Sequence, residues 1–167
     1  MPDTLRLQVA RVKDGDTIVA EAQNGDTVDV RVWGVDCPES SQPYGPAATD
    51  VAREVVGGDV VEIDVMDTDH YGRVIGRVRQ EGTDLAHALA QRGVAWHSRR
   101  YGTSSRLKEL EQDARSEGRG LWEQDNPTPP WEYRGTSAGS AVEGFGQFLV
   151  YFLLWLALFI GLIMWAG

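Results

Sequence analysis

The sequence predicts an α+β domain in which five strands close into a small barrel with three helices, followed by one transmembrane helix. Two observations predict the barrel: several short runs alternate apolar and polar residues, and glycine-containing turns separate them. A third observation, a long C-terminal run without charged residues, predicts the transmembrane helix.

The strand signal is clearest in the first third of the chain. Asn24-Gly25 separates two alternating runs, which is the strongest short-range sign of a β-hairpin. Asp14-Gly15 marks an earlier turn, so the first three strands are expected to form a meander. The five expected strands cover residues 5–12, 16–22, 27–35, 60–66 and 73–79.

Three helices are expected, at residues 46–56, 84–92 and 105–116. Pro46 suits the first turn of a helix, and glycines follow the end of all three segments. Five strands, with one helix after the third and further helices at the end, indicate a Greek-key barrel of the oligonucleotide/oligosaccharide-binding (OB) type.

The C-terminal part of the chain differs in composition from the barrel domain, which we place at residues 4–123. Residues 124–143 are rich in proline, glycine and serine and are expected to form a linker. No charged residue follows Glu143, and the apolar run at 145–166 has the roughly 20-residue length of a transmembrane helix. A buried core helix is the alternative, but this run is apolar on every face.

The first residues of the chain, Met1-Pro2-Asp3-Thr4, have neither the basic nor the apolar part of a signal peptide. We therefore expect the barrel domain in the cytoplasm, held to the lipid bilayer by its C-terminal helix. Arg134 is the basic residue near the anchor and supports this orientation only weakly.

The composition is acidic, with a formal net charge of −9. Only Lys13 and Lys108 are lysines, a bias that suits either adaptation to high salt or an ordinary acidic protein that favours arginine. Cys37 is the only cysteine, which excludes a disulfide within the chain.

Three segments carry most of the chemical information: DGDT at 14–17, RVWGVDCPE at 31–39 and DHYGR at 69–73. They supply carboxylates that suit a hard cation, a further carboxylate for a base, and two arginines. Hydrolysis of a phosphodiester needs such groups, because its transition state gathers negative charge on the phosphoryl oxygens.

These segments resemble the staphylococcal nuclease (thermonuclease) family. The resemblance covers nearly the whole barrel domain, and its motifs follow one another in the family's order. The matching runs are DGDT at 14–17, VRVWGVDCPE at 30–39, YGPAA at 44–48, DHYGR at 69–73, GVAW at 93–96 and GLW at 120–122.

The resemblance implies that Asp16 and Asp36 bind a catalytic calcium ion, together with the backbone carbonyl of Cys37. Hard divalent cations prefer such oxygen ligands. The family more often has alanine or threonine at the position of Cys37, so the thiol raises the question of soft-metal binding. Asp14 and Asp16 could instead both serve a tight turn; we expect that role of Asp14 alone.

By the same resemblance, Glu39 orients or activates the attacking water, and Arg31 and Arg73 hold the phosphate. A carboxylate is a competent general base, and the guanidinium fork presents paired donors to phosphate oxygens. For Glu39 the alternative is a solvated loop acid. For Arg31 it is a structural salt bridge with a neighbouring aspartate.

Five further residues are expected to contact the substrate. Tyr71 matches a phosphate-contacting residue of the family, and His70 stands where its best-known member has lysine, although His70 could also be a simple surface residue. Arg99, Arg100 and Tyr101 belong to a stretch without acidic residues, and such interleaved basic and aromatic side chains suit single-stranded nucleic acid.

The sequence thus predicts a membrane-tethered, calcium-dependent nuclease with a monomeric catalytic domain. The resemblance implies cleavage of DNA and RNA to 3′-phosphate products, with single-stranded DNA or RNA as the partner. The alternative is a non-catalytic OB-fold module that binds nucleic acid or serves as a scaffold at the membrane.

Overall fold

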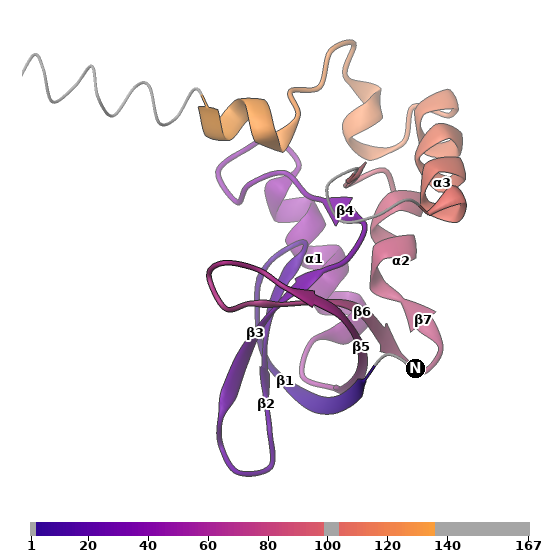
Figure 1. The fold of residues 1–167 in the computed structure, drawn as a ribbon. Coiled ribbons are helices and arrows are strands. Elements are labelled where there is room, and N and C mark those ends of the chain that lie inside the picture. Colours follow the sequence, from indigo (N-terminus) through magenta and orange to yellow (C-terminus); the bar gives the residue numbers. More distant parts are fainter. Residues whose placement is uncertain (1–2, 99–103, 136–167) are drawn as a thin grey trace, which may run out of the picture. The chain divides into compact units, whose positions relative to one another are not determined.

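A closed five-stranded barrel forms the centre of the domain (Figure 1). The structure, a computed structural model, describes residues 3–98 and 104–135. The strands follow the order β3-β2-β1-β5-β6, and a parallel pairing of β3 with β6 closes the barrel. The barrel strands are β1 (Thr4–Asp14), β2 (Thr17–Glu21), β3 (Thr27–Val32), β5 (Val60–Thr68) and β6 (Val74–Gln80).

Alternation along the strands fills the barrel. In β5, Val61 and Ile63 are buried while Val60 and Glu62 are exposed, because successive side chains of a strand point to opposite faces. The hairpin between β2 and β3 turns at Asn24-Gly25 as expected, with φ of 85° at Gly25. The largest fully buried side chains include Ile18, Val30, Val32, Val35, Val56, Val61, Ile63, Val78, Leu85, Leu89, Leu107 and Leu121.

Helices occur at the expected places in the chain, the first two against barrel strands and the third against the second. They are α1 (Gly45–Val56), α2 (Leu85–Gln91) and α3 (Ser105–Ser116), followed by a 3₁₀ turn, η1 (Gly120–Glu123). Side chains of Asp84 and Ser104 cap the amino ends of α2 and α3 by accepting backbone N–H groups, which satisfies donors that a helix leaves open. The α+β class and the five-stranded barrel are therefore confirmed.

The expected strand over 27–35 is split in two, which corrects that prediction. The chain turns at Gly34, whose φ of 85° favours glycine. A side chain there would also clash, because a Cβ would lie 2.5 Å from Leu107 Cδ1. After the turn, β4 (Val35–Asp36) pairs with β8 (Trp96–His97) in a separate two-stranded sheet. A further short strand, β7 (Thr83–Asp84), extends the main sheet beside β6.

The chain divides into two compact units, residues 1–130 and 131–167. In the second unit the backbone of residues 131–135 is helical. Across the described ranges, 3–98 and 104–135, no helix has the length and apolarity to cross a membrane. The predicted helix at 145–166 and residues 136–143 of the linker expected at 124–143 lie outside the described residues.

Candidate active site

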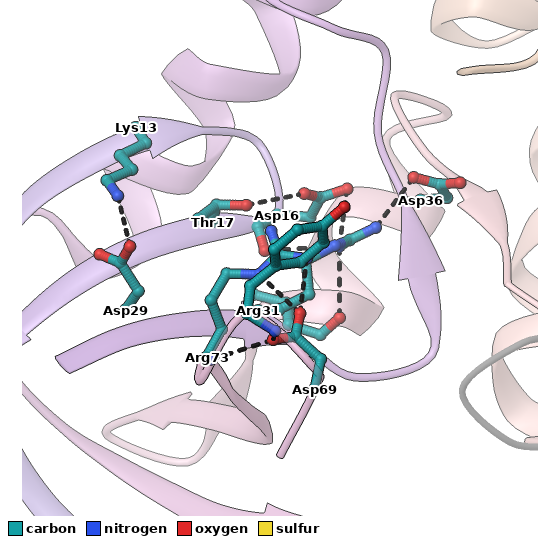
Figure 2. A network of polar contacts seen from close by, with 10 residues as sticks. Lys13, Asp16, Thr17, Asp29, Arg31, Asp36, Asp69 and Arg73 are labelled. Atoms are coloured by element: carbon teal, nitrogen blue, oxygen red, sulfur yellow. Dashed lines mark hydrogen bonds and ion pairs between the residues drawn. The ribbon is translucent and has the colours of Figure 1, made fainter. Parts of the chain in front are cut away.

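Arg31 lies between two buried carboxylates at one end of the barrel (Figure 2). Its Nη1 is 2.8 Å from Asp16 Oδ2 and its Nη2 is 2.8 Å from Asp36 Oδ1. All three residues are buried, with 6%, 5% and 8% of Arg31, Asp16 and Asp36 exposed. The salt bridge that the sequence left as an alternative for Arg31 is thus present, and it joins the two candidate metal ligands.

Three different elements bring this cluster together. Arg31 lies in β3, Asp16 in the turn before β2, and Asp36 in β4. The backbone N–H of Val32 donates to the Asp16 carbonyl at 2.8 Å, which fixes the turn to the neighbouring strand. Asp14 Oδ1 accepts the N–H of Asp16 at 3.1 Å, as expected for a turn-forming aspartate.

Cys37 contributes its backbone rather than its thiol. Its N–H donates to Asp16 Oδ2 at 2.5 Å. Burial raises the pKa of the Cys37 thiol well above its usual value, and the Asp16 carboxylate raises it further. A Cβ at Gly15 would lie 2.8 Å from Cys37 Sγ, so this glycine lets the turn approach the thiol closely. The thiol therefore stays protonated at neutral pH and is a poor soft-metal ligand.

The cluster holds more negative than positive charge. Burial raises the pKa of Asp16 to about 7; Arg31 opposes this shift, while Asp14 and Asp36 add to it. Burial alone would lower the pKa of Arg31, but the Asp16 and Asp36 carboxylates outweigh it and raise that pKa. One guanidinium does not balance the charge of Asp14, Asp16 and Asp36, so a further positive charge would stabilise the cluster. A hard divalent cation would supply it.

The protein donors for such a cation are few. Among residues 3–98 and 104–135, no three His, Cys, Asp or Glu side chains gather into one ligand set. A cation at Asp16 and Asp36 would therefore need backbone and solvent oxygens as well, which is common for calcium.

Glu39 lies in the loop between β4 and α1 and is half-buried. Its backbone N–H donates to Gln42 Oε1 at 3.2 Å, and its carbonyl accepts the Gln42 N–H at 2.8 Å. The sequence reasoning did not single out Gln42. The sequence signal that could have indicated Gln42 is its place three residues after the candidate base, in a loop rich in proline and serine.

Arg73 is held by Asp69, another residue that sequence reasoning did not assign. Asp69 Oδ2 accepts Arg73 Nε at 2.7 Å, and Asp69 Oδ1 accepts the backbone N–H groups of Tyr71 and Arg73 at 2.9 and 3.0 Å. Gly72 has φ of 81°, which closes the turn between them. Burial works in the opposite direction, but these hydrogen bonds together lower the pKa of the Asp69 carboxyl.

Beside this turn, His70 and Tyr71 form an exposed pair of rings. Their centroids are 3.8 Å apart, and the Arg73 guanidinium lies 5.7 Å from the Tyr71 ring. Tyr71 is 75% exposed, so its ring is available to a ligand. Arg99, Arg100 and Tyr101 lie outside the described residues.

Similar proteins were found over most of the chain. Residues 29–124 match the family described as "Staphylococcal nuclease homologue". An "Uncharacterized endonuclease" of Escherichia coli is 36% identical over 129 residues, covering 76% of this chain and 83% of the relative. The "Micrococcal nuclease" of Shigella flexneri is 33% identical over 143 residues, with coverage of 79% and 82%. "Staphylococcal-like nuclease CAN1" of Arabidopsis thaliana is 36% identical over 110 residues, 66% of this chain and 34% of the relative.

A closed barrel with an acid–arginine cluster at one end, together with nuclease-named relatives, defines the class as a small barrel nuclease. The chain belongs to the staphylococcal nuclease family.

Proposed function

We propose that the protein is a calcium-dependent nuclease that hydrolyses phosphodiester bonds of DNA and RNA and leaves 3′-phosphate products. One observation carries this proposal: Asp16 and Asp36, both buried, face the same guanidinium at 2.8 Å. Burying two carboxylates around one arginine is costly unless a further cation balances their charge.

In this proposal Asp16, Asp36 and the Cys37 carbonyl hold the calcium ion. When bound, the ion would supply positive charge next to the phosphoryl oxygens. The raised pKa of Asp16 supports this role. Its ionised form is unfavourable in the buried site, so a nearby cation stabilises that form strongly.

Glu39 accepts a proton from the water that attacks phosphorus. The new bond joins the water oxygen to phosphorus and the bond from phosphorus to the 5′ oxygen breaks, so the phosphate stays on the 3′ side. The departing 5′ oxygen takes up a proton from solvent. A positioned carboxylate base of this kind contributes roughly 10²–10⁴-fold to the rate.

Arg31 and Arg73 donate to the phosphoryl oxygens as negative charge develops there. Both are pre-oriented by carboxylates, Arg31 by Asp16 and Asp36 and Arg73 by Asp69. With 28% of its side chain exposed, Arg73 can be reached by a substrate.

The substrate is single-stranded DNA or RNA, bound by a monomeric domain through His70, Tyr71, Arg99, Arg100 and Tyr101. The exposed ring of Tyr71 supports this assignment, because bases and phosphates can be engaged by an aromatic side chain beside an arginine.

The proposal includes a C-terminal transmembrane anchor at 145–166, with the catalytic domain on the cytoplasmic side. Its support is the sequence, in which no charged residue follows Glu143. Protease treatment of intact cells against broken cells tests the side: a domain digested in intact cells would contradict the cytoplasmic assignment.

Hydrolysis of single-stranded DNA by the full-length chain in mild detergent tests the enzyme itself. We expect cleavage with calcium, none after chelation, and products with 3′-phosphates. Asp36→Asn should remove activity, whereas Asp29→Asn, the same change on strand β3 at an exposed pair with Lys13, should not. Tight binding of DNA without cleavage would instead identify a non-catalytic OB-fold module.

A further inference from the structure

Gln42 is a buried polar side chain in the loop that carries Glu39. Only 4% of it is exposed, and its amide uses both ends. Oε1 accepts the backbone N–H of Glu39 at 3.2 Å, and Nε2 donates to the backbone carbonyl of Thr128 at 2.5 Å. Because one end accepts and the other donates, the amide has one satisfied orientation.

The backbone of Gln42 also binds Glu39. The Gln42 N–H donates to the Glu39 carbonyl at 2.8 Å, so both peptide groups of Glu39 are held by the same residue. The loop is closed tightly around this contact: a Cβ at Gly45 would lie 1.9 Å from the Glu39 carbonyl oxygen.

Thr128 belongs to the segment 124–130 that follows η1, within the same compact unit as the barrel. A second contact joins the two segments, since Tyr44 Oη donates to Glu123 Oε2 at 3.1 Å. This second contact is exposed and does not involve Glu39. Gln42 is thus a buried link between residues 124–130 and the backbone of the candidate base.

We propose that Gln42 is a positioning residue, which fixes Glu39 against the segment 124–130 so that its carboxylate points at the attacking water. The proposal rests on the role of Glu39 in the proposed function. Removal of the Gln42 amide takes away the acceptor of the Glu39 N–H and the donor to the Thr128 carbonyl, so the loop moves to find water. A displaced base costs rate without removing substrate contacts.

The test compares kcat and KM on single-stranded DNA for the full-length chain and its variants, at saturating calcium. Gln42→Ala should lower kcat by about tenfold and leave KM within about twofold. Gln42→Glu has the same shape and keeps an acceptor for the Glu39 amide, and when burial keeps it protonated its hydroxyl can donate to the Thr128 carbonyl, so it should lose less. If Gln42→Ala does not fold, Gln42→Glu is the variant on which the prediction is tested. Tyr44→Phe, which breaks only the exposed contact to Glu123, should keep kcat within about twofold.

Two readouts separate positioning from a general structural role. In a Glu39→Gln background, Gln42→Ala should lower kcat no further, because both changes act through the same carboxylate. Hydrogen exchange at the Glu39 amide should be faster in Gln42→Ala than in Gln42→Glu, since only the latter keeps an acceptor.

Three results would overturn the proposal. Wild-type kcat in both Gln42 variants would remove the positioning role. So would a double variant in which Gln42→Ala lowers the kcat of Glu39→Gln by the same factor as it lowers that of the wild type. Wild-type kcat in Glu39→Gln itself is distinct, since it overturns the role of Glu39 in the proposed function and this inference with it.

Discussion

The carboxylate of Asp69 binds Arg73 twice, accepting its backbone N–H at 3.0 Å and its Nε at 2.7 Å. The same carboxylate accepts the Tyr71 amide. Together with the backbone hydrogen bonds that Asp69 makes to Gly72 and Arg73, it closes the loop between β5 and β6. This arrangement orients the guanidinium before any substrate binds, and a pre-oriented fork loses less entropy on contact with phosphate.

Asp69→Ala should therefore lower kcat/KM on single-stranded DNA by about 10- to 100-fold, the loss expected for a charge-assisted hydrogen bond. The matched control is Asp67→Ala, at the end of β5 next to this loop, whose exposed carboxylate accepts the neighbouring Thr68 amide. That variant should stay within about twofold of the wild type. Equal losses in both variants would show that the loop matters only as a whole.

Arg31 should stabilise the protein most when metal is absent. Arg31→Ala leaves Asp16 and Asp36 buried with no guanidinium, so in chelator we expect a loss of about 3–5 kcal/mol in the free energy of unfolding. Arg79→Ala, which breaks a more exposed pair with Asp64, should cost about 1 kcal/mol or less. Denaturant unfolding measures both, and calcium should restore more stability to Arg31→Ala than to the wild type.

Equal losses for Arg31→Ala and Arg79→Ala in chelator would contradict this account, because they would place Asp16 and Asp36 in solvent. Arg31→Lys keeps the charge and loses the fork. It should recover part of the stability and little of the activity.

Asp16 makes the stability of the metal-free protein depend on pH. Its pKa is 3.8 in the unfolded chain and about 7 in the folded protein. The folded state therefore holds this proton more tightly, so the contribution is fully present below the unfolded pKa and is lost as pH rises through about 7. In chelator, the wild type should lose more stability between about pH 5 and about pH 8 than Asp16→Asn does. Parallel profiles of the two proteins would contradict the assignment.

The Cys37 thiol should be unreactive in the native protein. It is buried, and its pKa is raised by burial and by Asp16, so little of the nucleophilic thiolate forms at neutral pH. A thiol reagent should label the chain only after unfolding. Cys37→Ala should keep calcium-dependent activity, because the proposed ligand is the carbonyl. Labelling as fast as in denaturant would show that the site opens.

The barrel was predictable because its signals are local. Alternation, Asn24-Gly25 and the helix-flanking glycines each report on a few neighbouring residues, and outside residues 33–35 they agree with the observed strands and helices. The short strands β4 and β8 could not be predicted, because a strand of two residues shows no alternation. Their pairing of Asp36 with Trp96 is set by contacts distant in sequence.

The site shows the same limit. Spacing and resemblance named Asp16, Arg31 and Asp36, but they could not choose between a phosphate ligand and an ion pair for Arg31. The described structure contains the ion pair of Arg31 with Asp16 and Asp36. In the proposed mechanism the same guanidinium also binds the phosphate. Asp69 was named only as part of the DHYGR run, without a role, and Gln42 was not named. Each acts on backbone groups of a loop, whose conformation a sequence pattern does not reveal.

Gly45 gives the most direct test of how closely the loop of Glu39 is packed. A Cβ at this position would lie 1.9 Å from the Glu39 carbonyl oxygen, where real contacts essentially never fall below 3.0 Å. Backbone cannot swing away as a side chain can, so in Gly45→Ala the loop must move, and a displacement of about 1 Å at a catalytic group costs on the order of 100-fold in rate. We therefore expect kcat to fall by about that factor at a temperature where the variant is still folded. Gly135→Ala, the same change where nothing lies within 4 Å, should leave kcat unchanged. A folded Gly45→Ala protein with wild-type kcat would mean that the position of the Glu39 backbone does not control the reaction.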